Sequence, residues 1–232
     1  MTGWARWAGR AGFASVAAVL IAASASALSA QRTALSSQRS VPSGPATATA
    51  VFSGGCFWGV QAVFEHVKGV IRAESGYTGG KAADANYETV STGSTGHAES
   101  VRVVYDPSQV SYQQLLDVFF SVAHDPTQLN RQGPDHGTQY RSAIWFTTPA
   151  QRAVAVEYIA RLNRSGTLDG PVVTTVTPLH GFYPAEDYHQ DYYVNHPESA
   201  YIVYNDVPKV EALQRQFPAL WRDAPVLIAK TG

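Results

Sequence analysis

The only cysteine of the sequence, Cys56, lies in a setting that suits a reactive thiol. It stands in the stretch SGGCFWG (residues 53–59), after Gly54 and Gly55 and before an apolar segment with helical spacing. A strand that turns into a helix here would place Cys56 at the helix N-terminus, where free backbone N–H groups and the helix dipole favour a thiolate with a lowered pKa. The two glycines would leave room for a substrate at the sulfur. The alternative is an inert, buried cysteine at the end of a strand.

Glu99 is the second residue whose position suggests chemistry. In the alternating stretch 98–106 it shares one face of a predicted strand with Val101, Val103 and Tyr105. Burial on that face would raise the pKa of the carboxyl group and keep it protonated near neutral pH. A neutral carboxylic acid is able to donate a proton in a reaction. The alternative is an exposed glutamate at a strand end.

Two further loops gather polar side chains. QGPDHGTQYRSA supplies Asp135, His136 and Tyr140, and HGFYPAEDYHQDYYVNHP supplies a second group of residues, which are His180, Glu186, Asp187, His189, Tyr192, Tyr193 and His196. A metal site is one interpretation, although no HExxH spacing occurs and one cysteine disfavours a structural zinc site. A Cys–His hydrolase is another, because spacing alone does not exclude a histidine acting as base for Cys56.

Length and composition indicate one domain with a substantial core. The chain has 232 residues, of which 45% are hydrophobic, and its formal net charge is −1. No run of lysine and arginine occurs, so there is no electrostatic reason to expect nucleic acid or an acidic membrane surface as a partner.

The N-terminal part differs from the rest and predicts export. Residues 1–30 carry two arginines, a short apolar run and then small residues, as in a secretory signal peptide cleaved near Ala27 or Ala30. A retained membrane anchor is the alternative. We expect a flexible linker over 31–47, a catalytic domain over 48–222 and a tail over 223–232. Cleavage would leave an exported protein of the periplasm or cell envelope with no stable membrane association.

The elements predicted for the domain alternate between strands and helices. Strands are predicted over 47–54, 70–77, 98–106, 142–148 and 171–179, and helices from Cys56 to about 68, then over 112–124, 149–163 and 208–217. Ser111 with Gln114 predicts a capping box, and Thr148 with Pro149 predicts a helix start. Residues 78–97 are predicted to form a long loop. The pattern favours a two-layer α/β or α+β domain.

Six motifs together resemble one family. GGCFWG, GYTGG, NYETVSTGSTGHAESVRVVYDP, HDPT, QGPDHGTQYRSAIW and AEDYHQDYY occur in order between about residues 50 and 217. This series is similar to the A-type peptide methionine sulfoxide reductases. The resemblance implies an α+β fold, a two-layer α/β sandwich with a mixed sheet, a ferredoxin-like core and long loops.

The resemblance also implies an activity and its catalytic residues. It implies thiol-dependent reduction of methionine-(S)-sulfoxide, free or in proteins, through a sulfenic acid on Cys56, and hence repair of oxidised proteins. Cys56 would attack the sulfoxide sulfur, and Glu99 would protonate or strongly hydrogen-bond the sulfoxide oxygen. Tyr87 and Tyr140 would add hydrogen bonds to that oxygen. A low Cys pKa beside a raised Glu pKa would be the divergent pair that such chemistry needs.

Four more positions match the substrate pocket of this family. Phe57 and Trp58 would form the walls around the ε-methyl group of the substrate. Asp135 would contact the substrate backbone or water in the pocket, and Tyr192 stands where the family supplies another tyrosine. The motif offers no histidine as a base for the thiol, which argues against the hydrolase.

The sequence departs from many relatives in its C-terminal region. They carry one or two C-terminal cysteines that form a disulfide with the reactive one, whereas Tyr201 and Ile202 stand here where "YC" often occurs. We therefore expect no bound cofactor and an external thiol reductant, which is thioredoxin, glutaredoxin with glutathione or another small thiol. The expected partners are oxidised methionine and this thiol donor, on a monomer. The alternative is a non-catalytic methionine sulfoxide binder or a thiol peroxide sensor.

Overall fold

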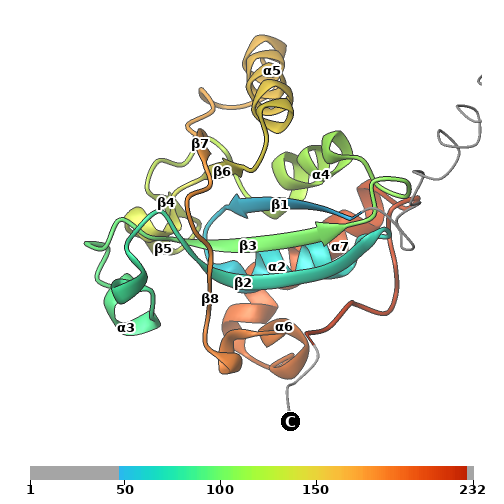
Figure 1. Ribbon diagram of the computed structural model, residues 1–232. Helices are drawn as coiled ribbons and strands as arrows, with labels where there is room; N and C mark the ends of the chain where they lie inside the picture. The colour runs from blue at the N-terminus through green and yellow to red at the C-terminus, as the bar shows by residue number, and fades with distance from the viewer. Residues whose placement is uncertain (1–46, 229–232) are drawn as a thin grey trace, which may run out of the picture. The chain divides into compact units, whose positions relative to one another are not determined.

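A six-stranded mixed sheet forms the centre of the protein in the computed structural model, which describes residues 47–228 (Figure 1). The strand order is β7–β6–β1–β3–β2–β8, and only the β6–β7 pair is parallel. The strands of this sheet are β1 (Ala48–Ser53), β2 (Val70–Thr78), β3 (Ala98–Tyr105), β6 (Ala143–Phe146), β7 (Thr175–Pro178) and β8 (Tyr183–Pro184). The α+β class with a mixed sheet, expected from the resemblance, is confirmed.

Helices and short turns connect these strands. The α-helices are α2 (Phe57–Glu65), α3 (Tyr87–Val90), α4 (Tyr112–Val118), α5 (Pro149–Ser165), α6 (Tyr192–Asn195) and α7 (Val207–Gln216). The shorter helical turns are η1 (Ala82–Asp84), η2 (Phe119–Ala123), η3 (Thr138–Tyr140), η4 (Asp187–His189) and η5 (Ile202–Asp206). A separate two-stranded ribbon is made by β4 (Arg131–Gln132) and β5 (Asp135–His136).

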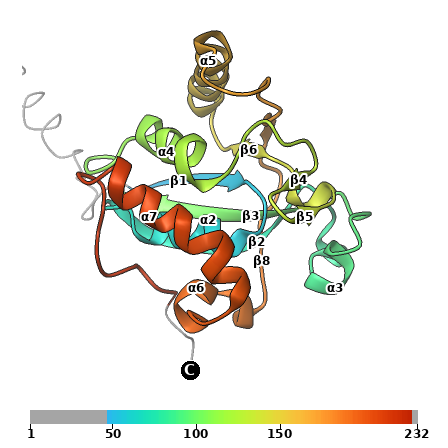
Figure 2. The same ribbon diagram turned by 180° about the vertical axis from the view of Figure 1, so that it is seen from behind.

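Helices α2 and α7 lie on the same face of the sheet, with α2 against β2 and β3 and α7 packed on α2 (Figures 1 and 2). The core under α2 is aromatic. The ring of Phe52 on β1 stacks on Phe64 of α2 at 5.2 Å and on Phe119 of η2 at 4.8 Å. Because Phe52 is fully buried, these contacts fix α2 relative to the strand that precedes Cys56.

The local start signals in the sequence are confirmed. Ser111 accepts from the Gln114 backbone, and Gln114 accepts from the Ser111 backbone in return, which is the predicted capping box at the start of α4. Thr148 caps α5 and Pro149 occupies its first turn. The helix predicted over 112–124 continues past Val118 as the wider turn η2.

The predicted long loop over 78–97 is wrong in part. It contains the turn η1 and the short helix α3, whose first backbone groups are capped by the Asn86 side chain accepting from Thr89 N–H at 3.1 Å. A four-residue helix leaves too short an apolar pattern to be visible in the sequence.

The predictions for the N-terminal part lie outside the described residues, apart from Thr47 at the end of the predicted linker. Within residues 47–228, no helix has the length and apolar character needed to cross a membrane. Part of the predicted tail is ordered against the domain. The Val226 N–H donates to the Glu65 carbonyl at 3.0 Å, and the Ile228 N–H donates to the Asp191 carboxylate at 3.1 Å.

Candidate active site

The turn between β1 and α2 places Cys56 at the N-cap of α2, as the glycine pattern predicts. Gly55 adopts φ of +90°, and a Cβ at this position would lie 2.5 Å from the Gln132 side chain. Only glycine therefore allows both this backbone conformation and the close approach of the segment from Gln132 onwards. Cys56 is 8% exposed, so a small opening reaches it.

The expected lowering of the Cys56 pKa is wrong. Burial is the largest cause of a pKa well above the ordinary value, and the negative charges of Glu99 and Asp206 raise it further. The Trp58 backbone N–H and the Lys209 ammonium lower the pKa but do not compensate. The helix N-terminus is present, yet two carboxyl groups from distant segments share the site with the sulfur. The free protein therefore holds Cys56 as a thiol at neutral pH.

Glu99 is the carboxyl group that the sequence predicts, buried and facing the start of α2. It is 3% exposed, and its Oε2 accepts a hydrogen bond from the Phe57 backbone N–H at 3.0 Å. Burial raises the pKa of Glu99 to about 8, against the lowering effect of that hydrogen bond, and the nearby Asp135 raises it too. The expected upward shift is confirmed, and Glu99 is predominantly protonated at pH 7.

Two tyrosine hydroxyl groups lie near Cys56, and one of them, that of Tyr140, is also near Glu99. Burial raises the pKa of Tyr140, and the charges of Glu99, Asp135 and Cys56 raise it further. The Tyr201 hydroxyl donates to Asp135 Oδ2, and burial and the Cys56 charge raise the pKa of this tyrosine as well. Both phenols are neutral hydrogen-bond donors at physiological pH.

Trp58 and Tyr192 form one stacked aromatic wall. Their rings are 3.7 Å apart with an interplanar angle of 6°, and Tyr201 meets Trp58 edge-on at 5.6 Å. The Trp58 Nε1–H donates to Nδ1 of His189 at 3.1 Å, and His189 is 2% exposed. This hydrogen bond fixes the orientation of the indole ring.

Phe57 and Tyr87 pack on the other sides of the same histidine. The Phe57 ring is 5.0 Å from His189, and the Tyr87 ring is 4.6 Å from it. The Tyr87 backbone N–H donates to Glu186 Oε1 at 2.8 Å, which holds the first residue of α3. His189 therefore positions three of the aromatic residues that the sequence predicts for the site.

The structure brings the eight predicted site residues into one region, but it also adds residues that sequence reasoning did not place there. They are Tyr201, which directly precedes η5, Asp206 at the end of η5, and Lys209 on α7, all far from Cys56 in the sequence. The one available signal was the tyrosine at position 201, in the segment where relatives carry a cysteine. Nothing local marks Asp206 or Lys209 as different from other charged residues at a helix start.

Gln190 anchors the segment that carries His189 and Tyr192. Its Oε1 accepts from the Ser75 N–H at 3.0 Å, and its Nε2 donates to the Ser75 carbonyl at 2.9 Å and to the Ala185 carbonyl at 3.1 Å. Replacing Gln190 by alanine is expected to lower the free energy of unfolding by about 3 kcal/mol, because buried backbone groups of β2 lose their partners. Denaturant unfolding followed by circular dichroism measures this change.

Gln214→Ala is the matched control, since Gln214 is exposed on α7 and its loss should change stability by less than about 0.5 kcal/mol. Equal stability of the two variants would show that Gln190 does not anchor this segment.

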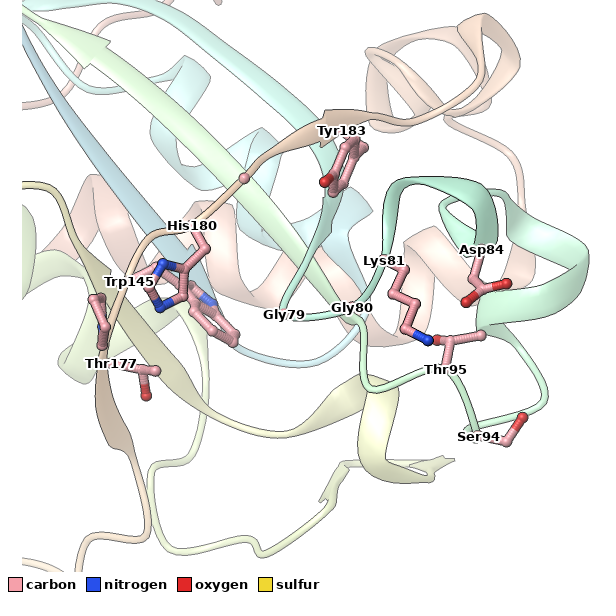
Figure 3. Close-up of a pocket in the computed structure, with 12 residues that line it drawn as sticks. Gly79, Gly80, Lys81, Asp84, Ser94, Thr95, Trp145, Thr177, His180 and Tyr183 are labelled. Atoms are coloured by element: carbon pink, nitrogen blue, oxygen red, sulfur yellow. The ribbon is translucent and has the colours of Figure 1, made fainter.

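A cavity of about 150 Å³ adjoins Cys56, lined among others by Asp135, Tyr201 and Lys209. A larger cavity of about 610 Å³ shares no lining residue with it. Figure 3 shows Trp145 and His180 on one side of the larger cavity and Lys81 on the other. The smaller cavity is therefore the one where a substrate would reach the Cys56 sulfur.

The alternatives left open by the sequence find little support in the geometry. Among residues 47–228, no group of three or more histidine, cysteine, aspartate and glutamate side chains is arranged to hold a metal ion. Within the same residues, Cys56 has no hydrogen bond to a histidine, which a Cys–His hydrolase would use to activate its thiol.

Comparison with known proteins agrees with the motifs. The family described as peptide methionine sulfoxide reductase matches residues 48–220. The peptide methionine sulfoxide reductase MsrA 2 of Mesorhizobium japonicum is 59% identical over 184 residues, which cover 79% of this chain and 94% of that protein. MsrA 2 of Synechocystis sp. is 54% identical over 171 residues, which cover 74% of this chain and 80% of that protein.

Solved structures give the same result. Methionine sulfoxide reductase A of Corynebacterium diphtheriae superposes with a TM-score of 0.58 at 38% identity, covering 67% of this chain and 77% of that one. Mxr1 of Saccharomyces cerevisiae in its reduced form superposes with a TM-score of 0.61 at 29% identity, covering 66% of this chain and 87% of that one. From its motifs, its fold and these matches, the chain belongs to the peptide methionine sulfoxide reductase family.

Proposed function

We propose that this protein reduces methionine-(S)-sulfoxide, free or in proteins, with Cys56 as nucleophile and Glu99 as the acid. The activity is thiol-dependent methionine sulfoxide reduction, and the S epimer follows from the family resemblance. One observation carries the residue assignment. A buried carboxyl group with a pKa of about 8 accepts a hydrogen bond from the N–H of Phe57, the residue directly after the thiol.

The sulfoxide oxygen must be protonated or strongly hydrogen-bonded before a thiol attacks the sulfur, because an unprotonated oxide is a poor leaving group. Neutral Glu99 supplies that proton. Tyr87 and Tyr140 add O–H donors, and the raised pKa of Tyr140 keeps its phenol protonated. These donors stabilise the oxygen as negative charge develops on it.

The protonation of Glu99 also governs the thiol. An ionised Glu99 raises the pKa of Cys56, so a neutral Glu99 removes one of the charges that oppose thiolate formation. When the carboxyl proton moves to the sulfoxide oxygen, the thiol proton is able to replace it on Glu99. The sulfur then attacks as a thiolate only while substrate is present, and free Cys56 stays less reactive toward other oxidants.

The reaction balances without a cofactor. The Cys56 sulfur is oxidised by two electrons and the sulfoxide sulfur is reduced by two, as the oxygen atom passes to Cys56. The products are methionine and a sulfenic acid at Cys56. Phe57 and Trp58 hold the ε-methyl group during this step, with Tyr192 stacked on Trp58. Asp135 contacts the substrate backbone or pocket water.

An external thiol regenerates the enzyme. The sequence holds one cysteine, so no disulfide forms within it. The first thiol attacks the sulfenic acid, giving a mixed disulfide and water, and a second thiol releases Cys56. Thioredoxin, glutaredoxin with glutathione and small thiols are the candidate donors, and the protein acts as a monomer.

The N-terminal part targets the catalytic domain to the periplasm or cell envelope. Residues 1–30 act as a signal peptide, residues 31–47 as a linker, residues 48–222 as the catalytic domain and residues 223–232 as a tail. N-terminal sequencing of the protein from a periplasmic extract tests this proposal. An N-terminus just after Ala27 or Ala30 supports export, whereas an intact Met1 in the cytoplasmic fraction contradicts it.

A single-turnover reaction with separated S and R epimers of a methionine sulfoxide peptide tests the main proposal. Without reductant, the S epimer is expected to yield one methionine per enzyme and to consume the only thiol of the chain. Dimedone should then label Cys56 as a sulfenic acid, and the R epimer should leave the thiol intact. Binding of the S epimer with no reduction and no thiol loss would show a binder rather than a reductase.

A further inference from the structure

Lys209 is the one basic residue among the described residues that line the cavity at Cys56. It stands on α7, and its side chain retains 18% exposure, so it is neither free on the surface nor sealed in the core. The other charged residue at this cavity is Asp135, whose Oδ2 accepts from the Tyr201 hydroxyl. Lys209 is therefore the available cation for an anion that enters beside the sulfur.

Asp206 fixes the position of the Lys209 ammonium group. The Lys209 Nζ lies 3.1 Å from Asp206 Oδ1, and Asp206 is completely buried. The other oxygen of Asp206 has no hydrogen-bond partner among the described residues. Burial raises the pKa of Asp206 and the Lys209 ammonium opposes that rise, so each charge stabilises the other and the movement of Lys209 is limited.

The ion pair is packed directly against the helix that begins after Cys56. A Cβ built at Gly59, in the first turn of α2, would lie 2.1 Å from Asp206 Oδ1 and 2.8 Å from Lys209 Nζ. Because Gly59 has no side chain, the Asp206–Lys209 ion pair is able to occupy this space. This packing holds both groups of the pair close to Cys56, and of the two only Lys209 lines the cavity where a reductant would enter.

A positive charge here favours regeneration. The attacking form of a reductant is its thiolate, and a thiolate that enters this cavity loses water beside Asp135, with the buried Asp206 carboxylate also close to Cys56. Without a cation, that approach would be opposed by burial and by like charge. The sequence holds one cysteine, so the attacking thiol must come from solution.

We infer that Lys209 pairs with the thiolate of the external reductant and is a catalytic residue of the regeneration step. In this step the reductant sulfur bonds to the Cys56 sulfur and the S–O bond of the sulfenic acid breaks. The oxygen leaves with two protons as water, one from the sulfenic acid and one that the reductant thiol released on ionising. The inference extends the proposed function to the class of reductant, a thiol that attacks as an anion.

The experiment isolates regeneration from sulfoxide reduction. The full chain is oxidised with hydrogen peroxide until its thiol is lost and its mass has risen by one oxygen atom. It is then mixed with 2-mercaptoethanol, and the loss of dimedone-reactive sulfenic acid gives a second-order rate constant. Lys209→Met is expected to lower this constant by about tenfold or more and to weaken its dependence on salt, because a unit charge near the reacting atoms is removed.

Two variants separate charge from structure. Lys209→Arg should restore most of the rate, since it keeps the cation. Arg215→Met, on the exposed part of the same helix, should leave the rate unchanged. Where Lys209→Met does not fold because Asp206 is left unpaired, Lys209→Gln carries the same expectation, since its amide is able to donate to Asp206 without supplying a charge. A wild-type rate in Lys209→Met or Lys209→Gln, or equal slowing by Arg215→Met, overturns the inference.

Sulfoxide reduction is measured in the same preparations. It distinguishes failure of the inference about Lys209 from failure of the proposed function. If Lys209→Met loses one thiol per S sulfoxide reduced and is regenerated at the wild-type rate, only the role of Lys209 is contradicted, and the proposed function stands. Absence of sulfoxide reduction in the wild type contradicts the proposed function, and the peroxide route still measures what Lys209 does.

Discussion

Replacing Cys56 by serine is expected to abolish methionine sulfoxide reduction, with a fall of at least about a thousandfold in the rate constant of the reductase step. An alcohol is a far weaker nucleophile than a thiol at neutral pH. It also cannot accept the sulfoxide oxygen as a sulfenic acid, so the two-electron transfer has no acceptor. Methionine formed in a single turnover, measured by chromatography, checks the result.

The fold is expected to survive this change. Serine is close in size to cysteine and is a favourable N-cap residue, which is the position that Cys56 occupies at the start of α2. Far-UV circular dichroism and thermal unfolding therefore serve as controls, and both should resemble the wild type. Turnover near the wild-type rate in a folded Cys56→Ser protein would remove Cys56 from the mechanism and leave the whole assignment without a nucleophile.

The features that could be predicted from the sequence are those decided locally. The position of Cys56 between a strand and a helix follows from the glycines before it and the apolar periodicity after it. The capping box at Ser111 involves residues three positions apart. Alternation places Glu99 on the strand face of Val101, Val103 and Tyr105, but it leaves the burial of Glu99 open, and Ser100 on the opposite face is buried as well.

The features that could not be predicted depend on which distant segments meet. The pKa of Cys56 rises because Asp206, 150 positions along the chain, lies close to the same sulfur as Glu99. A helix N-terminus alone favours a thiolate, but its effect is modest beside burial and two carboxyl groups. His189 was one of several histidines in a polar stretch, and only the tertiary packing shows that it accepts from Trp58.

Glu99→Gln is expected to slow the reductase step by about a hundredfold or more at pH 7. The amide has nearly the shape of the carboxyl group, and its oxygen is able to accept the Phe57 N–H that Glu99 Oε2 accepts in the wild type. It has no acidic proton to give to the sulfoxide oxygen. The variant thus removes the proton while keeping the size and this hydrogen bond.

Glu99→Gln should also change the pH dependence of the reductase step. In the wild type, Glu99 loses its proton as the pH rises through about 8, and the resulting carboxylate neither donates nor favours a thiolate beside it. The rate constant of the reductase step should therefore fall as the pH rises through about 8. In Glu99→Gln this fall should be absent, because no group at position 99 titrates.

Stability separates this chemical effect from damage to the fold. Between about pH 4.3, the ordinary pKa of an unfolded glutamate, and about 8, folded Glu99 keeps a proton that the unfolded chain gives up, so wild-type stability from this group declines as the pH rises. Glu99→Gln removes that decline and should be at least as stable as the wild type at pH 8. If Glu99 is the proton donor, Glu99→Gln should be stable but slow in the reductase step.

Glu88→Gln is the matched control, since Glu88 is an exposed carboxylate in the neighbouring α3 and its loss should leave the rate and the pH profile unchanged. A Glu99→Gln protein that reduces the S epimer at the wild-type rate at both pH 6 and pH 8 would mean that the proton comes from elsewhere. Tyr140 would then be the remaining donor close to both Cys56 and Glu99, and the high pKa of its buried phenol makes it a hydrogen-bond donor rather than an acid. For this reason the size of the Glu99 effect decides whether the sulfoxide oxygen is protonated or only hydrogen-bonded when the thiol attacks.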